Sequence, residues 1–138
     1  MTVVLIPLVI IIVIIGLVSS STEKMSISIK REYSGICDDH VDKIYNDYIV
    51  IDANTLQLAK TQLKLSTTSS ESIDVDFLNE FIVLTTSHGS HINGRLVDKC
   101  NNTMTFMSMT TRDYRPNLSY KFFVIDRAGF SSCNDIPI

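Results

Sequence analysis

The first residues of the chain carry an apolar pattern that differs from everything after it. Residues 3–18 are aliphatic except at Pro7 and Gly16, and no charged side chain occurs before Glu23. With its flanking threonine and serines this segment makes a helix about 33 Å long at 1.5 Å per residue, enough to cross a bilayer. We therefore expect residues 1–20 to form a single membrane-anchoring helix. Its lipid-facing positions include Val3, Leu5, Pro7, Ile11, Ile15 and Val18.

Two other interpretations of this segment stay open. Val18 and Ser20 are small residues with the spacing of a signal-peptide cleavage site, so the chain would then begin at Ser21. The second interpretation is a helix buried in the core of a soluble domain, although the excess of isoleucine and valine favours a helix surrounded by lipid. The basic residues Lys24 and Lys30 follow the apolar run, and the positive-inside rule alone would leave the rest of the chain in the cytoplasm.

We nevertheless expect the C-terminal domain to lie outside the cytoplasm, at a cell surface, in an envelope or in a periplasm. Asn101 and Asn117 each begin a glycosylation sequon in form. The three cysteines allow one disulfide, and we favour Cys100–Cys133, which would stabilise the domain by roughly 3–4 kcal/mol in the chain-entropy model. Cys37 would then be buried or paired between chains. Three buried thiols are the alternative.

After residue 20, short apolar stretches predict a chain rich in β-strands. Residues 21–35 combine a polar stalk with a first strand, since Met25, Ile27 and Ile29 alternate with serines. An Asn93-Gly94 pair between apolar stretches predicts a hairpin turn. Further strands are expected at 44–51, late in 76–85, at 103–111 and at 120–125, with a turn at 126–129. Residues 36–138 are thus predicted to form a compact, mainly β domain, either an antiparallel sandwich or a curled sheet, with α+β as the alternative.

The segment Thr55–Leu65 fits either a helix or a strand. Asn54 with Gln57 three residues later has the form of a capping box, which would place Leu56, Ala59 and Leu63 on one helical face. A period of two at Leu63 and Leu65 would instead continue a strand.

Charge and motifs exclude several function classes. The net charge is −3 and the two signs are interspersed, so the chain offers no basic stripe for nucleic acid. His88 and His91 are three residues apart in a predicted loop, but no third ligand lies near them in the sequence. We therefore expect no metal, no cofactor and no catalytic residue.

A methionine-rich stretch is the strongest candidate for a partner surface. Met104, Phe106, Met107 and Met109 would fall on both faces of one strand. One face would then join the core, and the other would be available to a protein partner.

The order Leu5-Ile6-Pro7, aliphatic run, Gly16 resembles the N-terminal helix of pilin-like and TadE-type pseudopilin subunits. That resemblance implies a β-rich head, often with a C-terminal cysteine pair, and a helix packed in a filament core. Position 5 is Leu5 where most pilins have glutamate, and residues 19–30 do not continue as a good helix. Small membrane-anchored viral envelope proteins share the same gross layout.

Together these features predict a membrane-anchored, non-enzymatic structural or interaction subunit of a larger surface assembly, such as an envelope complex or a filament. It would contact lipid through residues 1–20 and would bind protein partners, or further copies of itself, through its β domain. One alternative is a pilin-like minor subunit. Another is a small secreted or periplasmic hydrolase or metal-binding protein that uses His88 and His91.

Overall fold

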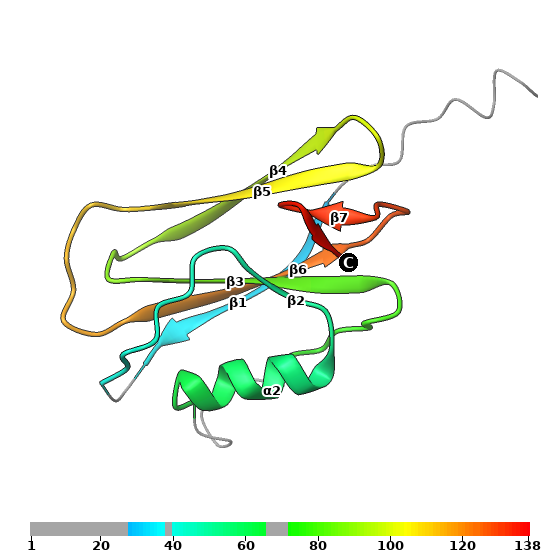
Figure 1. Cartoon of the computed structure of the whole chain (residues 1–138). Helices are drawn as coiled ribbons and strands as arrows, with labels where there is room; N and C mark the ends of the chain where they lie inside the picture. Colours follow the sequence, from blue (N-terminus) through cyan, green and yellow to red (C-terminus); the bar gives the residue numbers. More distant parts are fainter. Residues whose placement is uncertain (1–27, 38–39, 66–71) are drawn as a thin grey trace, which may run out of the picture.

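The computed structural model describes residues 28–37, 40–65 and 72–138, which form three layers (Figure 1). Two four-stranded sheets pack face to face, and one helix covers the outer face of the first sheet. The predicted anchor at residues 1–20 and the start of the stalk, with Met25 and Ile27, lie outside these residues. In the described ranges no helix is long and apolar enough to span a membrane. The prediction of a β-rich domain is confirmed.

The first sheet is antiparallel throughout, and its strand order is β1-β6-β3-β2. Its strands are β1 Ile29–Ile36, β2 Tyr48–Val50, β3 Glu80–Ser87 and β6 Ser119–Asp126. The second sheet has the order β4-β5-β7-β8, in which only β5 and β7 run parallel. Its strands are β4 Ile92–Lys99, β5 Thr103–Thr110, β7 Ser132–Cys133 and β8 Ile136–Pro137. The helix is α2, Ala53–Gln62.

The central strands β3 and β6 are buried on both faces, because the first sheet is the middle layer. On β6, Phe122 and Val124 pack in the core beneath α2, whereas Phe123 and Ile125 pack in the core between the two sheets. Strands covered on both sides have continuous apolar sequences rather than alternating ones. This explains why the runs at 81–84 and 122–125 were recognisable as strands.

The ambiguous segment forms the helix. Asp52 is its N-cap, since the Asp52 side chain accepts a hydrogen bond of 2.7 Å from the Thr55 N–H, so the predicted cap at Asn54 is wrong by two residues. The predicted apolar face is confirmed: Leu56, Ala59 and Leu63 are all buried against the first sheet.

The predicted hairpin turn at Asn93-Gly94 is wrong, because both residues lie inside β4. The turn between β4 and β5 is instead at 100–102, where Asn101 and Asn102 have φ of 65° and 57°, as a type I′ turn requires. Gly94 is needed for a different reason. A Cβ at this position would lie 2.6 Å from Phe106 Cζ, so only glycine lets β4 approach the buried rings so closely.

The strand predicted at 44–51 is shorter than expected. Asp47 has φ of 50°, which interrupts an extended backbone, and only Tyr48–Val50 pairs with β3. The Asp47 carboxylate then crosses to the second sheet, where it accepts from Ser108 N–H at 3.5 Å. The Asp47 side chain therefore joins the two sheets along one side, called here the closed side. Within the second sheet, the side-chain oxygen of Asn134 accepts from Phe106 N–H at 2.8 Å.

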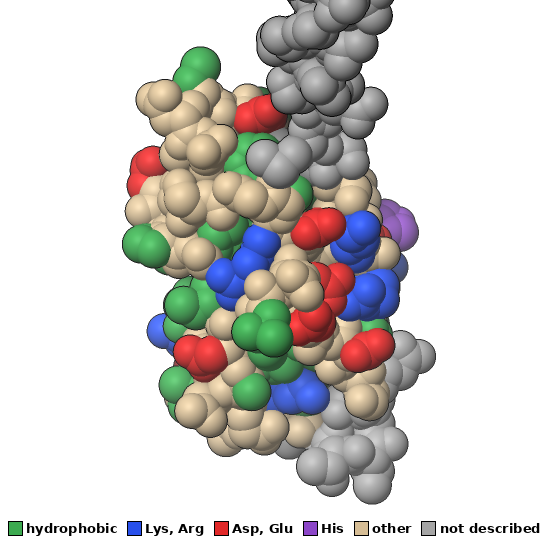
Figure 2. Space-filling view, turned by 90° about the vertical axis from the view of Figure 1, so that its right-hand side faces the viewer, with side chains coloured by type: hydrophobic (Ala, Val, Ile, Leu, Met, Phe, Trp, Pro, Cys, Tyr) green, Lys and Arg blue, Asp and Glu red, His purple; other side chains and the backbone are tan. Residues whose placement is uncertain are grey.

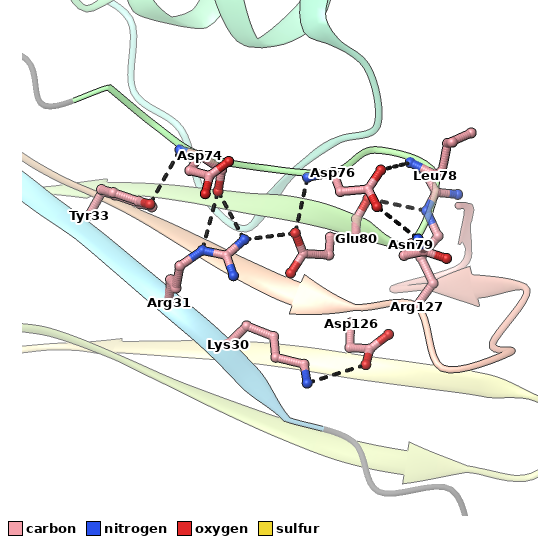
Figure 3. Close-up of polar contacts among 10 residues, drawn as sticks. All are labelled: Lys30, Arg31, Tyr33, Asp74, Asp76, Leu78, Asn79, Glu80, Asp126 and Arg127. Carbon is pink, nitrogen blue, oxygen red and sulfur yellow. Dashed lines mark hydrogen bonds and ion pairs between the residues drawn. The ribbon is translucent and has the colours of Figure 1, made fainter.

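Charged residues at the start of β1 bind residues of β3, of the segment before β3 and of β6 (Figure 3). The Arg31 guanidinium donates to the Asp74 carbonyl at 2.9 Å and to the Glu80 carboxylate at 2.7 Å. The bond to Glu80 raises the pKa of Arg31 above its ordinary value. Lys30 pairs with Asp126 at 3.5 Å.

Candidate functional site on the open side of the two sheets

A polar cleft of about 210 Å³ lies opposite the closed side, where the end of β1 faces the beginning of β4. Residues 34–36, 90–93 and 119–121 form its walls and floor, and Arg115 also lines it. None of these lining residues is acidic, whereas Arg115 and Lys121 are basic. The cleft is thus a cationic hollow between two strand edges.

The β1 wall of the cleft offers unpaired backbone groups. Cys37 N–H donates to the Leu118 carbonyl at 2.8 Å, which makes these two residues a hydrogen-bonded pair of the β1–β6 ladder. Such pairs alternate with non-bonded pairs along an antiparallel ladder. The N–H and C=O groups of Ser34 and Ile36 therefore point away from β6, and no described residue hydrogen-bonds to them.

The β4 wall is partly closed by a lysine. Thr111 N–H donates to the His91 carbonyl at 3.1 Å, so by the same alternation the carbonyl of Ile92 points out of the sheet. Lys121 donates to that carbonyl at 2.9 Å and also pairs with Glu32 at 3.1 Å. The Lys121 charge is therefore already engaged by the protein.

Two loops at the mouth of the cleft hold each other in place. Arg115 N–H donates to the His88 carbonyl at 2.7 Å, and His88 Nδ1 lies 2.9 Å from the Arg115 carbonyl. Because a carbonyl only accepts, Nδ1 carries the proton of this bond. Bonds from the Ser90 side chain, then the Thr111 side chain and Ser90 N–H, hold the pKa of Asp113 well below its usual range.

These tied loops expose an aromatic and a cationic side chain. Tyr114 stacks on His88 with ring centroids 4.8 Å apart, yet 78% of Tyr114 is exposed. The Arg115 side chain is 54% exposed, and its contact with Asp113 is a loose 3.9 Å from Nε. The terminal nitrogens of Arg115 thus have capacity for another acceptor.

The two histidines predicted as possible ligands lie in this loop, but they are not arranged as a metal site. His88 is used in the loop contacts, and His91 lines the cleft. Within the ranges that the structure describes, no group of three histidine, cysteine or acidic side chains could hold a metal ion.

The four residues of the candidate partner surface divide between the core and the exterior. Met104 and Phe106 are buried between the sheets, whereas Met107 and Met109 are 48% and 64% exposed on the outer face of β5. Arg95 is the cross-strand neighbour of Met107 on that face. The exposed pair is too small to mark a binding surface by itself.

Cys100 and Cys133 are both free thiols in the structure, so the predicted Cys100–Cys133 disulfide is not formed there. Cys100 is exposed in the turn after β4, while Cys133 is buried in the core between the sheets. Burial raises the pKa of the Cys133 thiol to about 11. The candidate glycosylation sites Asn101 and Asn117 are both exposed.

Sequence reasoning missed Arg115, Asp113 and the free edge of β1. Asp113 and Arg115 lie beside residues 88–91 because β4 pairs with β5, and the edge of β1 joins them because β1 pairs with β6, far along the chain. No local motif marks either pairing. Comparison of the chain with protein-family models, curated proteins and solved structures finds no match.

Proposed function

We propose that the chain is a membrane-anchored, non-enzymatic interaction subunit of a surface assembly, whose domain lies outside the cytoplasm and meets its partner with the cleft and its two loops. One observation carries this proposal: the cleft lies at the end of β1, whereas the chain enters the domain at the start of β1. The strand is about 23 Å long for seven steps of 3.3 Å. A domain held through the residues before Ile29 would therefore present the cleft away from its attachment.

The two ends of the domain also differ in how their charges are used. At the entry end, acidic, basic and apolar side chains are intermixed (Figure 2), and Lys30 and Arg31 are paired with Asp126 and Glu80. At the cleft end, Arg115 keeps most of its hydrogen-bonding capacity. This contrast favours the cleft end as the surface that recognises a partner.

The loop geometry supports binding rather than catalysis. The His88 side chain is already used in the structure, because its Nδ1 bonds to the Arg115 carbonyl and its ring stacks on Tyr114. Loops fixed in this way lose little freedom when a partner binds, and exposed tyrosine and arginine side chains are frequent anchors of interfaces.

The exposed thiol of Cys100 tests the anchoring and the orientation. Intact cells that make the full-length protein would be treated with a membrane-impermeant maleimide, with Cys100→Ser as the control. We expect labelling that depends on Cys100, in a protein that stays with membranes during alkaline carbonate extraction. Labelling only after lysis would refute the outward orientation, and release by carbonate would refute the anchor.

Site-specific photo-crosslinking tests the recognition surface. A photoreactive residue replaces either Tyr114 at the cleft end or Leu78, which is 88% exposed at the entry end. We expect a defined adduct in native cells from position 114 and none of that size from position 78. Equal adducts at both positions, or an adduct from position 78 alone, would contradict the proposal.

A further inference from the structure

We propose that the edge of β1 along the cleft receives an extended peptide that ends in a free carboxylate. The peptide adds as a strand beside Ser34–Ile36, and its carboxylate meets the Arg115 guanidinium. This inference rests on the proposed function and names the class of partner that the cleft takes.

The other strand edges of the domain are protected against such pairing. β2 has three residues, β8 contains Pro137, and the exposed edge of β4 carries Arg95, Asp98 and Lys99. Short strands, proline and charged side chains are the usual means by which proteins block edge pairing. The first half of β1 is likewise charged, whereas Ser34–Ile36 carries no charge.

The uncharged end of β1 has what strand addition requires. Ser34 and Ile36 each direct an N–H and a C=O out of the sheet, so an added strand could form two pairs of backbone hydrogen bonds. The Ile36 side chain, 49% exposed in the cleft, offers an apolar contact to the peptide. Addition of a strand to a free sheet edge is a recurrent mode of peptide recognition, in which backbone bonds give affinity and side chains give specificity.

The charges of the cleft favour a peptide whose end carries a negative charge. No acidic residue lines it, and Lys121 is already bonded to Ile92 and Glu32. Arg115 is the basic residue that remains available to a ligand, because its ion pair with Asp113 joins Nε to the carboxylate at a distance of 3.9 Å. Its terminal nitrogens form a planar fork that matches a carboxylate, which a lysine would not.

The test compares two probe peptides on the full-length chain in nonionic detergent. Acetyl-Thr-Val-Thr-Val with a free carboxylate and the same peptide as its amide are titrated, and backbone amide and Arg115 Nε–H shifts are followed by NMR. We expect the acid to shift the Ser34 and Ile36 amides and to bind about tenfold more tightly than the amide, as for one charge-assisted contact. Arg115→Gln should abolish that preference, and Arg112→Gln, an exposed neighbour outside the cleft, should retain it.

Two further probes separate strand addition from simple anion binding. A peptide acid with N-methylated valines keeps the carboxylate but loses backbone donors, and we expect it to lose the Ser34 and Ile36 shifts. Acetate alone should leave these amides unshifted. Equal binding of acid and amide, absence of shifts at Ser34 and Ile36, or the same shifts with acetate would overturn the inference. Those results would leave Cys100 labelling and Tyr114 crosslinking unchanged, so failure of this inference differs from failure of the proposed function.

Discussion

The close approach of β4 to the rings beneath it yields a quantitative prediction for Gly94→Ala. The added methyl would lie 2.6 Å from Phe106 Cζ and 2.8 Å from Phe123 Cε1, and both side chains are fully buried. The two rings contact each other, with centroids 4.9 Å apart, so neither has space to move. Overpacking of this kind costs about 1–3 kcal/mol, of which alanine recovers about 0.5–1 kcal/mol through lower backbone entropy. We therefore expect Gly94→Ala to lower the free energy of unfolding by roughly 1–2 kcal/mol.

Urea unfolding of the full-length chain in nonionic detergent, followed by circular dichroism, measures this loss. With a slope of about 1–3 kcal/mol per molar urea, the midpoint should fall by roughly 0.5–1 M. Asn93→Ala, on the exposed face of the same strand, should change stability by less than about 0.5 kcal/mol.

A double-mutant cycle identifies the cause of the loss. In a Phe106→Leu background, part of the ring is absent, so the cost of Gly94→Ala should fall by about 1 kcal/mol. A hairpin turn at Asn93-Gly94 would give a backbone cost that does not depend on residue 106. Additive effects of the two substitutions would therefore refute the packing explanation.

Three further predictions follow from contacts of single side chains. Asp52→Ala should lower the urea midpoint of unfolding through loss of the helix cap, whereas Asn54→Ala should leave it almost unchanged. Iodoacetamide at about pH 8 should modify Cys100 rapidly and spare Cys133. Cys133 is buried, and because its pKa is about 11, only about one part in a thousand of this thiol is thiolate at that pH. Equal labelling of the two cysteines, measured by peptide mapping of the native protein, would contradict this prediction. The pKa of Asp113 is lower in the folded than in the unfolded chain, so its contribution to stability is complete above the unfolded value of 3.8 and is lost as pH falls towards the folded value. Hydrogen exchange in residues 88–91 should accelerate over that acidic interval, and Asp113→Asn should remove the pH dependence.

Local sequence was enough to predict the elements whose pattern reflects their burial. The continuous apolar runs at 81–84 and 122–125 identified β3 and β6 as strands, because both faces of the first sheet are covered. The spacing of Leu56, Ala59 and Leu63 likewise gave the buried face of α2. The cap was misplaced because Asp52 and Asn54 are both good capping residues, and the structure uses Asp52, which accepts from Thr55 N–H.

The role of Gly94 and the residues that form the cleft could not be predicted without the tertiary structure. Asn-Gly in a sequence indicates a turn, but here the missing side chain of Gly94 makes room for Phe106, which lies on the neighbouring strand. The cleft depends on the position of β1 next to β6, so Ser34 and Arg115 could not be associated from their positions in the sequence. The histidines were visible as a pair, but their different roles depend on the loop that carries Arg115.

The position of β6 between β1 and β3 has a consequence for biosynthesis. β1 is made first, yet its pairing partner is the last long strand of the domain: Ile29 pairs with Ile125 and Ile36 with Ser119. Until residue 126 has been synthesised, the middle layer lacks β6, one of its two central strands, and neither core can be completed. Both cores are therefore completed only when the domain has been almost fully synthesised. A chain that folds this late would still be able to pass through a translocation pore, as the location proposed above for the domain requires.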